Sequence, residues 1–362
     1  MRTLIRPATG VAVLAALIFA APGGAATRQV LLGEQAKPPA GTPKGTTLNQ
    51  FFPEVVQVNV GDQVKFTSRS FHTASALGSA KAPPLFLPDA TGATYAGITD
   101  SLGQPFFFNS LPKLTYNVAA FAPGGKTVPG TGIASTGVLS PGPNGKPVSG
   151  SLTFTKAGTF KVVCTIHPGM TAKVIVKPAG APVPAQAEVT AQATKATAAA
   201  WAKAKALAAT KAPPNTVLAG VGTKTTLFSF LPRKLTVKAG TTVAFLAKAP
   251  SEVHNVAFGP EKYIDGLMKK IDFFPMGPGK PNQAPPFFFY GSDPPGAGGA
   301  YVYDGRNHGN GFFVTPLTDT QPGLPPAGLA PAARVKFTKA GKYHYFCLLH
   351  GPDMAGDIVV TP

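Results

Sequence analysis

The stretches 160-FKVVCTIHPGMTAKVIVKP-178 and 343-YHYFCLLHGPDMAGDIVVTP-362 hold the two cysteines of the chain in the same setting. In each stretch, apolar residues alternate with others up to the cysteine, a histidine follows three residues later, and a methionine comes soon after it. Alternation with a period of two predicts a β-strand with one buried face. Each stretch is therefore predicted to form two strands joined by a loop that carries Cys, His and Met.

The sequence around these loops also occurs twice. The segment 46-TTLNQFFPEVVQVNVGDQVKF-66 matches 225-TTLFSFLPRKLTVKAGTTVAF-245, and 154-FTKAGTFKVVC-164 matches 337-FTKAGKYHYFC-347. Between them lie 105-PFFFN-109 and 286-PFFFY-290. A repeat of this length is a whole domain, and a chain of 362 residues is long enough for two domains that each bury a core. The sequence therefore predicts an internal duplication.

The composition favours strands over long helices. The chain has 41 Gly and 39 Pro, with Val, Thr and Phe plentiful, which suits short strands joined by turns. We expect an all-β chain of two Greek-key β-sandwich domains, at residues 27–177 and 216–362. The segment 178–215 between them is rich in Ala, Lys, Thr and Pro, and its middle, from about Gln186 to Ala212, has the composition of a helix. We expect it to be a linker without chemistry of its own.

The N-terminus has the pattern of an export signal. Arg2 and Arg6 precede the apolar run 10-GVAVLAALIFAAP-22, and small residues follow at 24–26. This pattern predicts a cleavable signal peptide at residues 1–26 and a secreted or cell-envelope protein; the alternative is an uncleaved anchor, for which the run is short.

The chain is strongly basic, with a formal net charge of +18, yet charged residues are only 13% of it and the lysines are scattered. This pattern suits an acidic partner or an anionic envelope, not a nucleic-acid groove; the alternative is simple solubility.

Each half of the sequence holds one candidate set of metal ligands. A disulfide between the two cysteines would leave two identical neighbourhoods unexplained, so metal ligation accounts for the pattern better. A thiolate and two imidazoles, with a weakly bound thioether on the axis, form the ligand set of a blue-copper electron-transfer site. The alternative is a duplicated sandwich that has lost its copper, with buried Cys and satisfied His. The candidate ligands are His72, Cys164, His167 and Met170 in the first half and His254, Cys347, His350 and Met354 in the second.

The stretch 164-CTIHPGMTAKVIV-176 resembles the C-terminal ligand loop of the amicyanin and plastocyanin branch of the cupredoxins, with its Cys-x-x-His-Pro-x-Met pattern. The upstream segments 61-GDQVKFTSRSFHT-73 and 240-GTTVAFLAKAPSEVHNV-256 resemble the strands that lead to the first His ligand in that family. The resemblance covers the opening strands and ligand loops of both halves. It implies two type 1 copper ions, one per domain, and one-electron transfer to redox partner proteins. It also implies that His167 and His350 expose their ring edges as electron ports.

Two departures from the family pattern distinguish the two sets. The second loop has one more residue before Met354 than the first has before Met170. The residue after the distant histidine is Thr73 in the first half and Asn255 in the second; in the family, an Asn there ties the ligand loop to that histidine, and such ties tune metal affinity and potential. We therefore expect two similar but non-identical centres.

An enzymatic role is disfavoured by the histidine count. The chain has six histidines, four are already assigned, and no His-x-His pair exists, so a catalytic copper with an open position lacks ligands. The remaining alternatives are a copper carrier or storage protein and a structural envelope protein without metal.

Two features outside the ligand sets are open to interpretation. We expect His344 to lie on the strand surface and His308 to be either solvated or in contact with a partner. The two PFFF segments are predicted to be buried anchors, with an apolar docking patch as the alternative.

Overall fold

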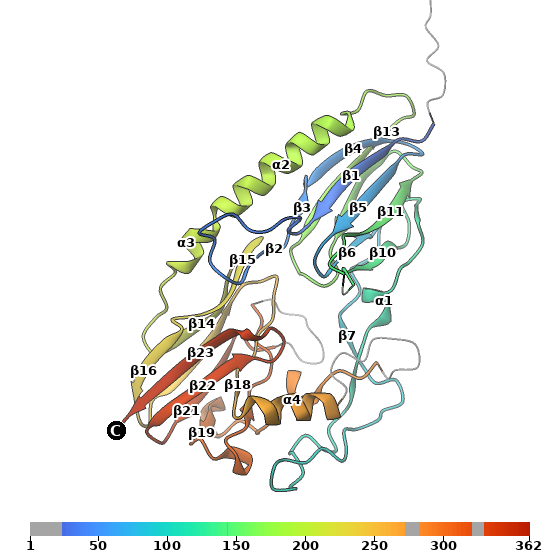
Figure 1. Cartoon of the computed structure of the whole chain (residues 1–362). Helices are drawn as coiled ribbons and strands as arrows, with labels where there is room; N and C mark the ends of the chain where they lie inside the picture. The colour runs from blue at the N-terminus through green and yellow to red at the C-terminus, as the bar shows by residue number, and fades with distance from the viewer. Residues whose placement is uncertain (1–23, 143, 272–281, 321–328) are drawn as a thin grey trace, which may run out of the picture.

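The computed structural model describes residues 24–142, 144–271, 282–320 and 329–362 (Figure 1). The predicted signal peptide, residues 1–26, lies almost entirely outside the described residues. Within the described ranges, no helix is both long enough and apolar enough to cross a bilayer.

The first half of the chain forms a sandwich of two five-stranded sheets. Their facing sides enclose one apolar core that includes Val30, Phe66, Phe154 and Val174. One sheet has the order β3 (Phe51–Phe52), β1 (Thr27–Leu32), β5 (Gln63–Ser68), β11 (Val148–Phe154), β9 (Thr127–Val128). The other has the order β10 (Ala134–Leu139), β6 (His72–Ala76), β12 (Gly158–Val163), β13 (Thr171–Lys177), β4 (Val55–Asn59).

The second half forms a second sandwich around a core that includes Phe230, Phe245, Phe258 and Tyr345. One sheet has the order β19 (Tyr301–Tyr303), β21 (Ala332–Phe337), β17 (Thr242–Lys248), β14 (Thr216–Gly222), β15 (Thr225–Leu231), β2 (Thr46–Leu48). The other has the order β16 (Lys234–Lys238), β23 (Gly351–Thr361), β22 (Gly341–Cys347), β18 (Ala257–Phe258), β20 (Phe313–Val314).

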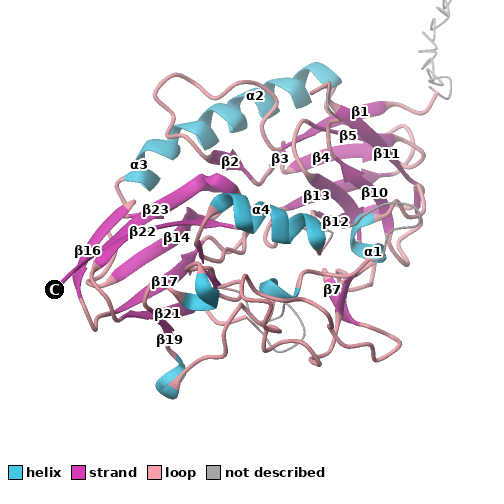
Figure 2. Cartoon of the chain, turned by 60° about the horizontal axis from the view of Figure 1, so that its bottom comes forward, coloured by secondary structure: helices cyan, strands magenta, loops and turns pink. Residues whose placement is uncertain are grey.

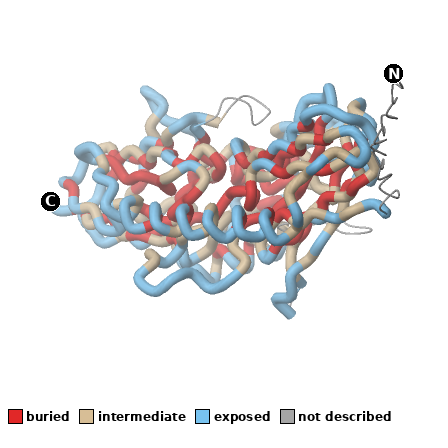
Figure 3. The backbone as a smooth tube through the Cα atoms, turned by 90° about the horizontal axis from the view of Figure 1, so that it is seen from above, coloured by how far each residue is buried: buried red, intermediate tan, exposed pale blue. Residues whose placement is uncertain are grey.

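These sheets confirm the predicted all-β sandwich fold. Apart from the edge strand β2, the strand order of the two sandwiches corresponds position by position, including the parallel pairs β1 with β5 and β14 with β17. Figure 3 shows buried residues, in red, gathered in the interior of the molecule, with exposed residues, in pale blue, around them.

The segment between the sandwiches contains helices, as its composition predicted. The helix α2 (Gln186–Ala202) is followed by α3 (Ala204–Ala208), and both run along one side of the molecule (Figure 2). The buried side chains Ala193 and Ala200 of α2 pack against Leu48 and Phe52 of the first half. The helical region ends four residues short of the predicted limit, because Pro213 and Pro214 follow and disfavour helix just before them.

The long stretches between the first His and the Cys of each half are folded against each other. They contain a short two-stranded sheet and several small helices, and the helix α4 packs its buried Ile264 and Leu267 against residues of both halves. These elements are β7 (Phe86–Pro88), β8 (Leu114–Tyr116), α1 (Val118–Phe121), α4 (Glu261–Lys270) and the 3₁₀ helices η1 (Pro286–Phe288), η2 (Ala297–Gly299) and η3 (Asn307–Gly309).

The two sandwiches are joined closely. The strand β2 comes from the first half of the sequence but pairs antiparallel with β15, with Leu48 opposite Thr225. The PFFF segments meet across the junction: the ring centroids of Phe106 and Phe287 are 5.3 Å apart, and both side chains are buried. Most of the PFFF phenylalanines are therefore buried anchors, whereas Phe289 is half-buried and Phe107 is 37% exposed. The domain boundaries 27–177 and 216–362 stay a prediction.

Candidate metal centres

The first candidate centre forms where three segments of the first sandwich converge. His72 begins β6, Cys164 follows the last residue of β12, and His167 lies in the turn before β13. The Nδ1 atoms of the two histidines are 3.0 Å apart, and the Sγ atom of Cys164 lies 3.4 Å from Nδ1 of His167 and 3.9 Å from Nδ1 of His72. The turn is closed by the N–H of Cys164, which donates to the carbonyl of Met170 (3.0 Å).

The second candidate centre has the same donor atoms in the same arrangement. The Nδ1 atoms of His254 and His350 are 3.1 Å apart, and Sγ of Cys347 lies 3.4 Å from Nδ1 of His350. In each centre the three possible ligand atoms lie within 4.8 Å of one another. The structure therefore brings together the His, Cys and His that the sequence singled out in each half.

Both predicted axial methionines are buried in the same apolar core as their cysteine. Met170 belongs to the core of Cys164, and Met354 to the core of Cys347; each methionine is 1% exposed. The extra residue of the second loop is taken up by a register shift, in which Phe346 pairs with Ala355 but Cys347 pairs with Gly351. The extra residue therefore does not displace Met354 from the core.

The donor set fits a copper ion. Nitrogen and sulfur ligands bind metals at about 2.0–2.3 Å, so an ion between three atoms 3.0–3.9 Å apart can touch all of them. Burial alone would raise the pKa of both cysteine thiols, but the neighbouring histidines lower the pKa of Cys164 and of Cys347 well below its ordinary value. A thiolate is the form of cysteine that binds metal.

Equivalent glycines hold the distant histidine in each centre. Gly33 and Gly220 both have φ of 66°, and a Cβ atom at either position would collide with Nε2 of His72 or of His254. Within the described residues, neither Nε2 atom has a hydrogen-bond partner. The backbone thus encloses the outer side of each ring and leaves Nδ1 directed at the other donors.

Thr73 and Asn255 both connect the distant histidine to the ligand loop, as expected for Asn255. Oδ1 of Asn255 accepts from the backbone N–H of Leu348 (2.9 Å) and lies 3.6 Å from Sγ of Cys347. Thr73 makes the equivalent tie, because its Oγ1 accepts from the backbone N–H of Thr165 (2.8 Å). The backbone N–H of Thr73 also points at Sγ of Cys164, at 3.4 Å.

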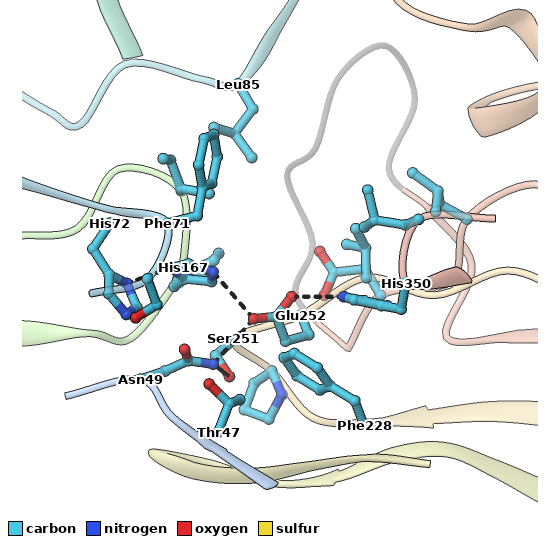
Figure 4. Close-up of a pocket in the computed structure, with 18 of the residues that line it drawn as sticks. Thr47, Asn49, Phe71, His72, Leu85, His167, Phe228, Ser251, Glu252 and His350 are labelled. Carbon is cyan, nitrogen blue, oxygen red and sulfur yellow. Dashed lines mark hydrogen bonds and ion pairs between the residues drawn. The ribbon is translucent and has the colours of Figure 1, made fainter. Parts of the chain in front are cut away.

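A residue that the sequence reasoning missed, Glu252, lies between the two centres (Figure 4). Its Oε1 atom is 3.2 Å from Nε2 of His167, and its Oε2 atom is 3.5 Å from Nε2 of His350. Burial alone would raise the pKa of Glu252, but the two histidines hold it well below its ordinary value. Burial would likewise lower the pKa of His167 and of His350, whereas Glu252 and the cysteines raise each to about 10. In the sequence, only its place two residues before His254 could have drawn attention to Glu252.

The prediction that His167 and His350 expose their ring edges is wrong. Their side chains are only 12% and 16% exposed, because the two ligand loops face each other across the junction of the sandwiches. Both rings line a cavity of about 380 Å³ whose walls are mostly apolar, with Phe71, Phe228 and Leu349 among them. The two ring edges therefore point into the molecule.

The other two histidines form ion pairs. His344 is 52% exposed and pairs with Asp357, as expected for a strand surface. His308 is not a solvated loop residue: its side chain is 14% exposed and lies between Asp100 and Asp293, at 3.1 and 3.2 Å. Because Asp100 belongs to the first half, His308 helps to join the two sandwiches.

The chain matches no protein-family model and no curated protein. Among solved structures, it is similar to plastocyanin from Dryopteris crassirhizoma, with 21% identity over 40% of this chain and 99% of that one and a TM-score of 0.21. It is also similar to amicyanin from Paracoccus versutus (21% identity, 42% and 88% of the chains, TM-score 0.22). A third similar structure is auracyanin A of Chloroflexus aurantiacus, described as a "blue" copper protein (18% identity, 40% and 96%, TM-score 0.24). Similarities of this size carry no weight for function, which rests on the geometry of the two centres.

Proposed function

We propose that the chain is an exported electron-transfer protein that holds one type 1 copper ion in each of two centres. The observation that carries this proposal is the same buried triangle of two Nδ1 atoms and one Sγ atom in both sandwiches. The proposed ligands are His72, Cys164, His167 and Met170 in the first centre and His254, Cys347, His350 and Met354 in the second.

The protein's part in this function is to hold and shield the ligands. Copper, when bound, would supply one-electron redox chemistry. The two sheets fix the distant histidine and the ligand loop relative to each other, and the surrounding apolar core keeps water from the thiolate. A site held this rigidly needs little rearrangement when its charge changes by one.

An electron carrier fits the donor inventory better than an enzyme or a metal carrier. Both ring nitrogens of His308 face aspartates and His344 lies on an exposed strand, and within the described residues neither belongs to a group of side chains that could hold a third, catalytic copper. The proposed ligands other than the loop histidines are at most 4% exposed, which favours a resident ion over a freely exchanged one.

Export and partners belong to the same proposal. The pattern of residues 1–26 supports removal of a signal peptide and a place outside the cytoplasm. The net charge of +18 supports an acidic redox partner or an anionic cell envelope.

The direct test is to load the mature chain with Cu(II) and record copper content and the visible spectrum. We expect two copper ions per chain and an intense blue thiolate-to-copper band. Cys164→Ser and Cys347→Ser should each remove about half of the colour and one copper, because thiolate is the ligand that defines a blue site. A colourless, metal-free protein would refute the proposal.

A further inference from the structure

The two ligand loops share one carboxylate. Glu252 contacts His167 through one of its oxygens and His350 through the other, so the two proposed centres meet at a single side chain (Figure 4). Each of these histidines directs its other nitrogen, Nδ1, at the cysteine of its own centre, at 3.4 Å in both cases. The chain of contacts therefore runs without a gap from Cys164 to Cys347.

We propose that Glu252 is a bridge that couples the two centres, so that an electron taken up at one passes to the other within the molecule. This inference rests on the proposed function, because it needs copper in both centres. It assigns His167 and His350 to exchange between the centres instead of to two separate external partners.

The chemistry of imidazole sets the direction of each contact. When Nδ1 serves as a metal ligand, the neutral ring carries its proton on Nε2, so each ring turns an N–H group toward Glu252. A metal-bound histidine commonly donates this N–H to a carboxylate, which fixes the ring and raises its basicity. Glu252 can accept from both rings at once because a carboxylate has two oxygens. The covalent path crosses Cε1 of each ring and Cδ of Glu252, and it is interrupted only at the two contacts between Nε2 and the carboxylate, at 3.2 and 3.5 Å.

The position of Glu252 is built by neighbours from both halves. Its side chain is 8% exposed, and Nδ2 of Asn49 donates to its Oε1 atom at 3.0 Å. Nδ2 of Asn49 is also 3.1 Å from Oγ of Ser251, and the backbone N–H of Asn49 donates to the carbonyl of Lys224. Asn49 from the first half thus holds a carboxylate of the second half against a histidine of the first.

The two halves have different residues at the position of Glu252. Glu252 lies two residues before His254, and the residue at the same place before His72 is Ser70. Ser70 lines the same cavity as Glu252 but carries no charge. A single acidic side chain, supplied by the second half, therefore contacts both ligand loops.

The transfer moves one electron and no atoms. One centre is oxidised by one electron while the other is reduced by one, and both Nε2–H protons stay on their rings. Glu252 keeps its negative charge throughout. No external oxidant or reductant is needed for this exchange, only for the reactions that load and unload the pair.

The test measures electron exchange between the centres in the copper-loaded full chain. A Met170→Gln background makes the two centres distinguishable, because the axial ligand tunes the potential of such a site. A flash reductant delivers less than one electron per molecule, and the redistribution between the two blue bands is followed over time. We expect a rate that does not depend on protein concentration.

Glu252→Gln is the informative variant. Glutamine has the same shape but only one acceptor oxygen, and its NH₂ group would meet one of the two N–H donors, so one contact must break. We expect exchange to slow by about 10–100-fold, as for other residues that hold metal ligands. Glu34→Gln is the matched control: Glu34 is another acid of the same cavity, its carboxylate accepts hydrogen bonds from Thr47 and Leu48, and its variant should exchange at the parent rate.

A second readout does not depend on electron transfer. In the chain loaded with silver(I), a closed-shell ion, the Nε2–H protons of His167 and His350 should give slowly exchanging NMR signals. Both signals should shift in Glu252→Gln and neither in Glu34→Gln. A Glu252→Gln spectrum in which neither signal shifts would overturn the bridge.

The outcomes separate this inference from the proposed function. Two blue coppers with exchange that is slow, depends on concentration or is unchanged in Glu252→Gln would overturn the bridge and leave the electron-carrier proposal standing. A chain that takes up no copper would overturn both. Fast exchange that slows in Glu252→Gln but not in Glu34→Gln supports the bridge.

Discussion

Removing the amide of Asn255 should weaken the second centre and leave the first intact. In Asn255→Ala, the backbone N–H of Leu348, at present 2.9 Å from Oδ1, loses its acceptor in a buried place. A buried donor left without a partner costs about 1–3 kcal/mol, so we expect the free energy of unfolding to fall by that amount. The ligand loop beside Cys347 also loses its tie to the strand of His254. Residues of this kind contribute about 10–100-fold to metal affinity.

Two measurements check this prediction separately. Denaturant unfolding of the metal-free chain gives the stability change, and a chelator titration of the copper-loaded chain gives the affinity of each centre from the loss of blue absorption. Thr73→Ala is the matched variant, because Thr73 makes the equivalent tie to Thr165 in the first centre. The reasoning would be refuted if Asn255→Ala weakened both centres equally, or if the chain lost stability while both affinities stayed unchanged.

Three further predictions concern the junction and the first centre. Phe106→Ala should lower the free energy of unfolding by about 3–5 kcal/mol, and Phe107→Ala, at a side chain that is 37% exposed, should lower it by less, as judged by urea denaturation; equal effects would contradict the buried contact. His308→Ala should destabilise by about 1–3 kcal/mol near pH 5 and by less near pH 9. Burial alone would lower the pKa of His308, but Asp293 and Asp100 raise it above its ordinary value. The stabilisation by His308 is therefore full below the unfolded-state pKa of about 6.5 and is lost as pH rises through the folded-state pKa. A stability difference between parent and variant that grows with pH would contradict this sign. Gly33→Ala should remove about half of the blue absorption, whereas Gly61→Ala, which also has positive φ but meets no neighbour, should keep it.

The ligand loop of each centre could be predicted from the sequence because its pattern lies within a short stretch of neighbouring residues. Alternation around Cys164 and Cys347 marked the strands, and the short spacing from each cysteine to its loop histidine fixed the turn. The repeated order of segments then placed a distant histidine in each half, and the structure brings all three donors of each half together. Burial of both methionines follows from the same alternation, since Met170 directly precedes β13 and Met354 lies within β23.

The junction of the two sandwiches could not be predicted in this way. Glu252 contacts His167 and Asn49 from the other half of the sequence, and no periodicity links such distant positions. The strand β2 pairs with β15 although a sandwich of its own half was available. The predicted exposure of His167 and His350 came from a resemblance to single-domain proteins. In this chain the two ligand loops face each other, so both rings point inward.

The most direct test of the account is a reductive titration of the copper-loaded chain, with copper content measured on the same sample. We predict two copper ions per chain and a blue band that is bleached by one electron per copper and restored on reoxidation. A chain that holds no copper, or that holds copper without a blue band that can be cycled, would contradict the account.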